Sequence, residues 1–159
     1  MILKYAKLTS TAREPMKYSA DASGYDLFSS SEKRIEIPPR GRACIPTGIA
    51  IALEPGYCGR LASNSSLSCV FGIEVGAGVI DADYRGTIQV ILYNHSNDAS
   101  FTVKKGDRIA QLLITKVFQP RFEKMEPEDF MKLNGEGEDI PCCDLPRNTK
   151  ELGRDENKD

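Results

Sequence analysis

The chain has 159 residues, of which 21 are lysine or arginine and 23 are aspartate or glutamate. This length fits one domain with a real hydrophobic core. A charge so close to balance excludes bulk attraction to nucleic acid or to membranes as the basis of function. No apolar run approaches the roughly 18 residues that a membrane span needs, and the N-terminus lacks the apolar region of a signal peptide. We therefore expect an intracellular protein that has neither nucleic acid nor membrane as a partner.

The first part of the chain predicts short strands broken by proline and glycine. The expected elements are a half-buried strand at residues 1–8, a loop at 9–18, a glycine-centred turn into an apolar piece at 20–28, a strand at 34–37 and the longest strand signal at 42–53. Pro38-Pro39 ends one of these strands. Glu54-Pro55-Gly56 is typical of a tight turn, because proline presets φ and glycine takes the strained position.

The second part continues the pattern. We expect a strand at 57–61, a short helix at 65–71, strands at 87–93, 101–103 and 108–118, and one more helical turn at 127–133. Many short strands separated by turn residues favour an all-β fold, a jelly roll or distorted β-barrel of antiparallel strands with one short helix. The β domain is expected to span residues 1–122, followed by a flexible, polar and acidic C-terminal arm at 123–159.

The five cysteines favour a reducing compartment. They are odd in number and lack the spacing of a zinc site, since Cys142 and Cys143 are adjacent, whereas a zinc half-site has about two intervening residues. Such cysteines are typical of intracellular proteins that have no disulfide framework.

The stretch Gly76–Gly86 is the first candidate for a functional site. Its leading glycines permit a positive φ or a close approach of the backbone. If residues 79–84 are extended, Asp81 and Asp83 point to one face and Tyr84 points to the other. Paired acids are more often a solvated hairpin edge. Acids that follow Gly-Val-Ile and stand beside a tyrosine and an arginine favour chemistry instead.

Five segments occur in a recognisable order. The first is Ser23–Leu27, the third is Gly78–Gly86 and the fourth is Gly106–Leu112. The second, Gly59–Leu67, lacks a proline and an arginine of the known motif. The nearest candidate for the fifth is Asn134–Asp139, with asparagine for arginine and acids in place of an aromatic. In these motifs and their spacing, the chain resembles the trimeric deoxyuridine triphosphatases (dUTP pyrophosphatases) from about residue 3 to residue 120.

The resemblance implies hydrolysis of dUTP to dUMP and pyrophosphate by attack of water on the α-phosphorus. Asp81 matches the general base, Asp26 matches the acid that contacts Mg²⁺ through water, and Arg108 matches an orienting partner of Asp26. The residues that match substrate-binding positions are Asn64, Ser65, Ser66, Gly78, Val79, Ile80, Tyr84, Arg85 and Gln111. Tyr84 would stack under the deoxyribose, and uracil would lie in a β-hairpin. A homotrimer is implied because family sites are assembled from several subunits.

These residues also have ordinary structural interpretations. Asn64-Ser65-Ser66 is typical of a helix cap, and Tyr84 is typical of a core or rim aromatic. Asp26 would be a common turn aspartate. His95, the only histidine, lies in a polar turn and is not expected to take part in catalysis.

The departures from the motifs leave other hypotheses open. Asn64 stands where arginine would give phosphate a planar, charged pair of donors, and such arginines are worth several orders of magnitude in rate. The alternative is therefore a catalytically weakened or inactive homologue that binds nucleotide or a protein partner. A third hypothesis is a deaminase of the same fold that acts on deoxycytidine nucleotides. Turnover of dUTP separates the first two, and ammonia release from dCTP tests the third.

Overall fold

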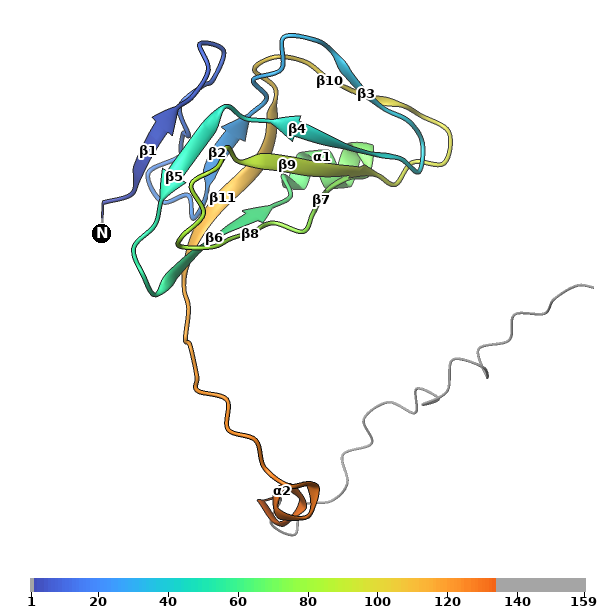
Figure 1. Ribbon diagram of the computed structural model, residues 1–159. Coiled ribbons are helices and arrows are strands. Elements are labelled where there is room, and N and C mark those ends of the chain that lie inside the picture. Colours follow the sequence, from blue (N-terminus) through green and yellow to red (C-terminus); the bar gives the residue numbers. More distant parts are fainter. Residues whose placement is uncertain (1, 134–159) are drawn as a thin grey trace, which may run out of the picture. The chain divides into compact units, whose positions relative to one another are not determined.

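The computed structural model describes residues 2–133 of the chain. Its contacts divide the chain into two units, Met1–Gln119 and Pro120–Asp159. The larger unit contains β1–β11 and α1, and the described part of the smaller one contains α2 (Pro127–Leu133), where a helical turn was predicted (Figure 1). Residues 134–159, with Cys142, Cys143 and most of the predicted arm, lie outside the described residues. Within residues 2–133, no helix is long and apolar enough to cross a membrane.

The larger unit is built from short strands that pair only in antiparallel fashion. In chain order the elements are β1 (Lys4–Lys7), β2 (Tyr25–Phe28), β3 (Ile35–Ile37), β4 (Arg42–Pro46), β5 (Ile49–Ala52), β6 (Tyr57–Ala62), α1 (Ser65–Phe71), β7 (Ile73–Gly76), β8 (Val79–Ile80), β9 (Gln89–Asn94), β10 (Phe101–Val103) and β11 (Arg108–Lys116). The predicted all-β jelly-roll class with one short helix in the β domain is confirmed.

The described strands form four sheets. A four-stranded sheet has the order β2-β11-β6-β8, a three-stranded sheet has the order β4-β9-β7, and two pairs join β1 to β5 and β3 to β10. In the four-stranded sheet, β2 and β8 are therefore the two edges, separated by β11 and β6. This separation decides how the candidate site residues are distributed.

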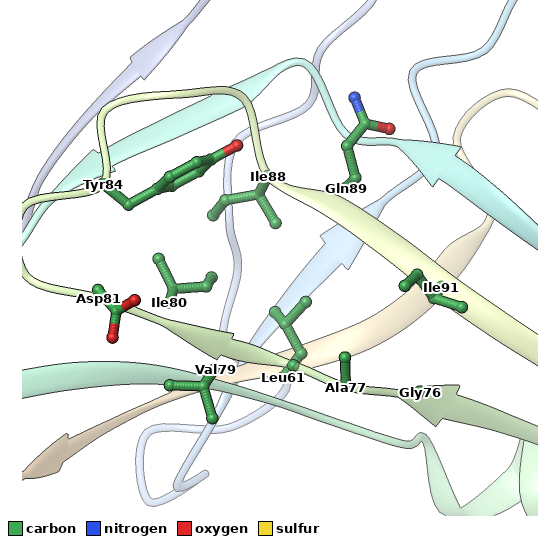
Figure 2. Close-up of a pocket in the computed structure, with 11 residues that line it drawn as sticks. Leu61, Gly76, Ala77, Val79, Ile80, Asp81, Tyr84, Ile88, Gln89 and Ile91 are labelled. Carbon is green, nitrogen blue, oxygen red and sulfur yellow. The ribbon is translucent and has the colours of Figure 1, made fainter.

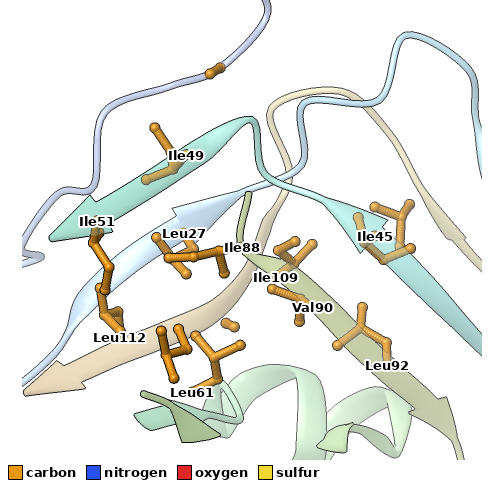
Figure 3. Close-up of a cluster of buried hydrophobic side chains, with 14 of the residues drawn as sticks. Leu27, Ile45, Ile49, Ile51, Leu61, Ile88, Val90, Leu92, Ile109 and Leu112 are labelled. Carbon is orange, nitrogen blue, oxygen red and sulfur yellow. The ribbon is translucent and has the colours of Figure 1, made fainter. Parts of the chain in front are cut away.

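One cluster of aliphatic side chains forms the core of the unit (Figure 3). Alternation along β9 directs Val90 and Leu92 inward, both fully buried, while Gln89 and Tyr93 face outward. The cluster includes Leu27, Ile45, Ile49, Ile51, Leu61, Ile88, Val90, Leu92, Ile109 and Leu112. Each such side chain contributes roughly 1.5–3 kcal/mol when it is fully buried, so the cluster holds the ladders together.

The strand β11 departs from simple alternation, because Ile109 and Ala110 are both buried. The pairing of β11 with β2 shifts register between Arg108 and Ala110. Such a bulge inserts one extra residue and turns the following side chains to the other face. Arg108 and Gln111, three positions apart, would otherwise point to opposite faces.

The expectation of a half-buried strand at residues 1–8 is wrong. The strand β1 is shorter, and all four of its residues are exposed. Among the described strands its one partner is β5, so the backbone is paired, while no second layer in this part of the chain covers the side chains. Alternation in the sequence marked a strand correctly, but burial requires a facing layer.

Candidate functional site

A first pocket, here called the hairpin pocket, opens beside β8 (Figure 2). Its volume of about 210 Å³ is below the roughly 300–1,000 Å³ of pockets for drug-sized ligands, so it suits one small ring. Its lining residues are Leu61, Gly76, Ala77, Gly78, Val79, Ile80, Asp81, Tyr84, Ile88, Gln89 and Ile91. Asp81 and Tyr84 lie together at one end of this mostly aliphatic lining. The pocket thus combines an apolar slot with an acid and a phenol.

The turn between β7 and β8 forms one wall of the hairpin pocket. Gly78 has a φ of 106° and Ala77 has a φ of 54°, which is uncommon for a residue with a Cβ. The Leu61 N–H donates to the Gly78 carbonyl at 2.8 Å, and a Cβ on Gly78 would lie 3.0 Å from the Leu61 carbonyl oxygen. Glycine is therefore required at position 78 for both its φ and its contact with β6. The predicted positive φ in this stretch is confirmed.

Asp81 and Tyr84 are joined by a turn. The Tyr84 N–H donates to the Asp81 carbonyl at 3.1 Å, and the strand β8 ends at Ile80. The extended segment over 79–84 that the sequence left as a condition is therefore present only up to Ile80. Because the chain turns, the Asp81 and Tyr84 side chains line the same pocket, whereas an extended strand would have sent them to opposite faces.

A second pocket, here called the polar pocket, has a volume of about 320 Å³. Its lining residues are Tyr18, Asp26, Asn64, Ser65, Ser66, Arg108 and Gln111. Six of the residues singled out from the sequence thus meet here, although they come from three separate motifs. Hydroxyl and amide groups, one carboxylate and one guanidinium make this pocket suitable for a polar or anionic ligand.

The bulge in β11 assembles one side of the polar pocket. It allows both Arg108 and Gln111 to line it, and Gln111 pairs with Asp26 across the β2–β11 ladder. Arg108 Nη1 lies 3.2 Å from Asp26 Oδ2, and the Gln111 amide donates to the Ser63 carbonyl at 3.3 Å. Asp26 is 8% exposed, and its carboxylate is held in the pocket lining by the contact with Arg108. The predicted pairing of Asp26 with Arg108 is present.

Asn64 caps α1 and also lines the polar pocket. Its Oδ1 accepts a hydrogen bond from the Ser66 N–H at 3.1 Å, which is the usual N-cap contact. The residue is buried, and its side-chain amide still has its donor group available, since no hydrogen bond from Nδ2 is present in the described part of the chain. The cap interpretation is confirmed, and it does not exclude a role in binding.

The two pockets share no residue, and strand pairing separates them. Asp26, Gln111 and Ala62 form one row across β2, β11 and β6. Ile80 pairs with Gly59, so Asp81 follows beside Cys58. Cys58 and Ala62 are four residues apart on β6, or about 13 Å along the strands, and β2 and β8 are three strand spacings, or about 14 Å, apart across them. Within one chain, Asp81 therefore lies far from Asp26.

Arg85 lines neither pocket. Its Nη1 donates to the carbonyls of Ala82 at 2.7 Å and Tyr84 at 2.9 Å, so its guanidinium braces the turn that carries Asp81. It also borders a cleft of about 560 Å³ on the other side of this turn, which Asp81 and Asp83 line as well. A substrate contact by Arg85 stays a prediction.

Sequence reasoning missed several lining residues. In the hairpin pocket these are Leu61, Ile88, Gln89 and Ile91, and in the polar pocket it is Tyr18. The apolar residues of this group look like any other strand residue in the sequence. Tyr18 stands in a segment assigned to a loop, and no local pattern connects it to residues some 45 and 90 positions away.

A divalent cation in the polar pocket would have to be shared with a ligand. Within residues 2–133, no group of three or more histidine, cysteine, aspartate or glutamate side chains is placed to hold a metal ion. Asp26 supplies one carboxylate. Mg²⁺ is usually held by one or two carboxylates together with phosphate oxygens and water, so the residues present fit Mg²⁺ that arrives with a phosphate ligand.

Comparisons with known proteins agree in one family. The family description that matches is dUTPase, over residues 11–137. The chain is 47% identical over 136 residues to deoxyuridine 5'-triphosphate nucleotidohydrolase of Oryza sativa subsp. japonica, which covers 86% of this chain and 77% of the relative. It is 46% identical over 129 residues to the mitochondrial deoxyuridine 5'-triphosphate nucleotidohydrolase of Homo sapiens, which covers 81% of this chain and 50% of the relative.

A solved structure shares the fold. The dUTPase from phage phi11 of S. aureus, in a mutant described with the coordination of a structural Mg(II) ion, matches with a TM-score of 0.73 and 24% sequence identity. The match covers 79% of this chain and 97% of that one. At 24% identity this likeness shows a shared fold and nothing beyond it.

Proposed function

We infer that the chain, which belongs to the dUTPase family, hydrolyses dUTP to dUMP and pyrophosphate. The observation that carries this function is the hairpin pocket, where Asp81 and Tyr84 meet at one end of a slot for a single ring. The reaction is inferred from the family to which the chain belongs, and the residues proposed to carry it out line the pocket. Relatives with 46–47% identity are named as nucleotidohydrolases, which does not favour the inactive alternative.

In the hairpin pocket, uracil would lie against the turn between β7 and β8. The turn brings main-chain groups of Gly78 and its neighbours to the pocket wall, and such groups recognise a base by its hydrogen-bonding edge. A base whose edge leaves these groups unpaired is rejected, and a narrow slot also disfavours an added methyl group. Val79 and Ile80 would supply apolar contacts. Tyr84 would stack under the deoxyribose and leave no room for a 2′-hydroxyl.

The proposed general base is Asp81. Hydrolysis at the α-phosphorus requires a group within hydrogen-bond reach of the attacking water, and a carboxylate accepts its proton as the bond to phosphorus forms. The proton moves to Asp81, the bond between the α-phosphorus and its bridging oxygen breaks, and pyrophosphate leaves. Asp81 is exposed at the end of the pocket, so water reaches it without a change of fold.

The polar pocket would hold the phosphates. Ser65 and Ser66 offer hydroxyl and N–H groups, the free Nδ2 of Asn64 adds a donor, and Gln111 would act through water. Mg²⁺, bound with the nucleotide and contacted by Asp26, would neutralise part of the triphosphate charge. Arg108 keeps the Asp26 carboxylate in position through the contact of 3.2 Å.

These assignments require two copies of the chain at each site. A base must be within hydrogen-bond reach of the water at the α-phosphorus, yet Asp81 and Asp26 of one chain are separated by about 13 Å along the strands and about 14 Å across them. The hairpin pocket of one copy therefore works with the polar pocket of another. A head-to-tail contact that closes on itself gives a ring, and we propose the homotrimer that the resemblance implies.

A steady-state assay of pyrophosphate release from dUTP tests the function. The wild-type chain should turn over dUTP in the presence of Mg²⁺, and EDTA should abolish turnover until Mg²⁺ is restored. Asp81→Asn keeps the size of the side chain and should lose at least about 1,000-fold in kcat, because it removes the base and its charge. If wild type and Asp81→Asn release pyrophosphate equally slowly while both bind dUMP, the inactive homologue is the correct description.

A further inference from the structure

Tyr18 is a residue of the polar pocket that none of the five motifs contains. It lies two residues after Met16, whose N–H and carbonyl both pair with the backbone of Asp26 at 3.2 and 2.6 Å. This bridge ties the segment before β2 to the strand that carries Asp26. The bridge therefore brings the backbone close to Tyr18 next to the strand of Asp26, and Tyr18 lines the pocket.

The Tyr18 ring is exposed yet held in place. It is 86% exposed, and the Arg108 guanidinium carbon lies 5.9 Å from its ring centre. The same guanidinium contacts Asp26 at 3.2 Å. The Arg108 guanidinium thus contacts the Asp26 carboxylate and also faces the Tyr18 ring, which is the geometry of a cation–π interaction.

The polar pocket is short of free positive charge. Among the described residues that line it, Arg108 is the one cation, and it is paired with Asp26, the one carboxylate. The remaining donors are neutral, and a triphosphate of charge near −4 needs as many of them as the pocket can supply. A phenol hydroxyl is such a donor, and hydrogen bonds to charged acceptors are stronger than those between neutral groups.

We propose that Tyr18 closes the polar pocket over the terminal phosphates of the bound nucleotide. Its hydroxyl donates a hydrogen bond to a β- or γ-phosphate oxygen, and its ring keeps Arg108 over Asp26. This role rests on the proposed function, and it adds a binding residue outside the motifs. It concerns the triphosphate and not the base or sugar, which lie in the hairpin pocket of another copy.

The test compares two nucleotides in calorimetric titrations of the full chain with Mg²⁺. The non-hydrolysable analogue dUpNHpp has all three phosphates, whereas dUMP has only the first. Tyr18→Phe should weaken dUpNHpp binding about 3–10-fold, and Tyr18→Ala about 10–30-fold, because one hydrogen bond and then the ring are lost. Binding of dUMP should stay within about twofold for both variants. Tyr5→Phe, at an exposed tyrosine outside the pocket, is the matched control and should bind both ligands like wild type.

Equal binding of dUpNHpp by wild type, Tyr18→Phe and Tyr18→Ala would overturn the proposal and leave the proposed function intact. Weakening of dUMP as much as of dUpNHpp would also overturn it, because the ring would then support the pocket as a whole. If wild type binds neither nucleotide, both the proposed function and the role of Tyr18 fail.

A fluorescence measurement gives an independent result. The chain contains no tryptophan, so Tyr18→Trp introduces a single indole at the rim of the polar pocket. Its emission should shift or be quenched as dUpNHpp saturates the site, and it should change little with dUMP. Tyr5→Trp is the control and should not respond. An indole at position 18 that is silent to saturating dUpNHpp would contradict the proposal.

Discussion

The end of the Tyr84 ring packs against Gly86 and occupies the space that a Cβ at position 86 would need, so any other residue type there would displace the ring. A Cβ at position 86 would overlap the phenol oxygen and the ring carbon that carries it. The Tyr84 hydroxyl donates to the Thr87 carbonyl at 3.0 Å, which holds the ring against the glycine. The orientation of the proposed sugar-stacking ring thus depends on two contacts. The ring packs against Gly86, which has no side chain, and its hydroxyl is hydrogen-bonded to Thr87.

We expect Gly86→Ala to impair catalysis more than Tyr84→Phe does. The alanine methyl displaces the whole ring, whereas the phenylalanine loses only the bond to Thr87. Gly86→Ala should therefore lower kcat/KM for dUTP by about 10–100-fold, and Tyr84→Phe by less than about fivefold. Steady-state kinetics with dUTP and UTP measure both effects. Because a displaced ring no longer fills the space of a 2′-hydroxyl, the ratio of UTP to dUTP turnover should rise in Gly86→Ala. An unchanged ratio would count against the stacking role of Tyr84.

Two substitutions separate the two roles of Asn64. Asn64→Asp keeps an oxygen that accepts from the Ser66 N–H, so unfolding in urea should be little changed. It replaces the free donor by a negative charge in an anion pocket, so the KM for dUTP should rise at least about 10-fold. Asn64→Ala removes the cap and should cost about 1 kcal/mol of stability. Should Asn64→Asp keep the wild-type KM, Asn64 would be a cap and nothing more.

The sequence predicted those parts of the fold that depend on local chemistry. The helix at Ser65–Phe71 was predicted with the same bounds, because its cap and its C-terminal glycine are local signals. The strand predicted at Thr87–Tyr93 begins two residues before β9 and ends one residue before it does, since β-branched residues precede Gln89. The exposure of β1 could not be predicted, because it depends on which layer faces the strand.

The residues of the candidate site could be predicted from the sequence, but their division between the hairpin pocket and the polar pocket could not. Motif matching names Asp26 and Asp81 together, and it contains nothing about their separation in one chain. That separation comes from the order β2-β11-β6-β8, which is set by pairings distant in sequence. The bulge that turns Gln111 toward the polar pocket could not be predicted either. No residue in this strand marks the position at which the pairing with β2 shifts by one residue.

The buried Asn94 should be the most sensitive polar residue for stability. Its Nδ2 donates to the carbonyls of Ile37 at 3.0 Å and Ala99 at 2.8 Å, and its Oδ1 accepts from the Ser96 N–H at 3.0 Å. Asn94→Ala leaves three buried or half-buried groups unpaired and should lower the free energy of unfolding by about 3–5 kcal/mol. Urea unfolding at matched protein concentration measures this. Asn97→Ala, on an exposed turn nearby, should change it by less than about 0.5 kcal/mol.

Mixing two inactive variants tests whether each site is built from two copies. Asp81→Asn removes the base from the hairpin pocket, and Asp26→Asn removes the carboxylate from the polar pocket. Each variant alone should be nearly inactive. If a site combines Asp81 of one copy with Asp26 of another, chains unfolded together at equal amounts and refolded should regain about a quarter of wild-type activity, because half of the chains supply each intact residue.

A site contained in one chain gives the opposite result. No mixed assembly would then hold an intact site, and the refolded mixture would have only the summed activity of its parts. Refolding Asp81→Asn with Asp81→Ala is the control, since this mixture lacks every intact base and should stay inactive. Light scattering on the same samples reports whether the chains assemble, so that failure to refold is distinguished from failure to complement. Recovery near a quarter requires the copies to exchange residues, because Asp26 and Asp81 stand at opposite edges of one sheet.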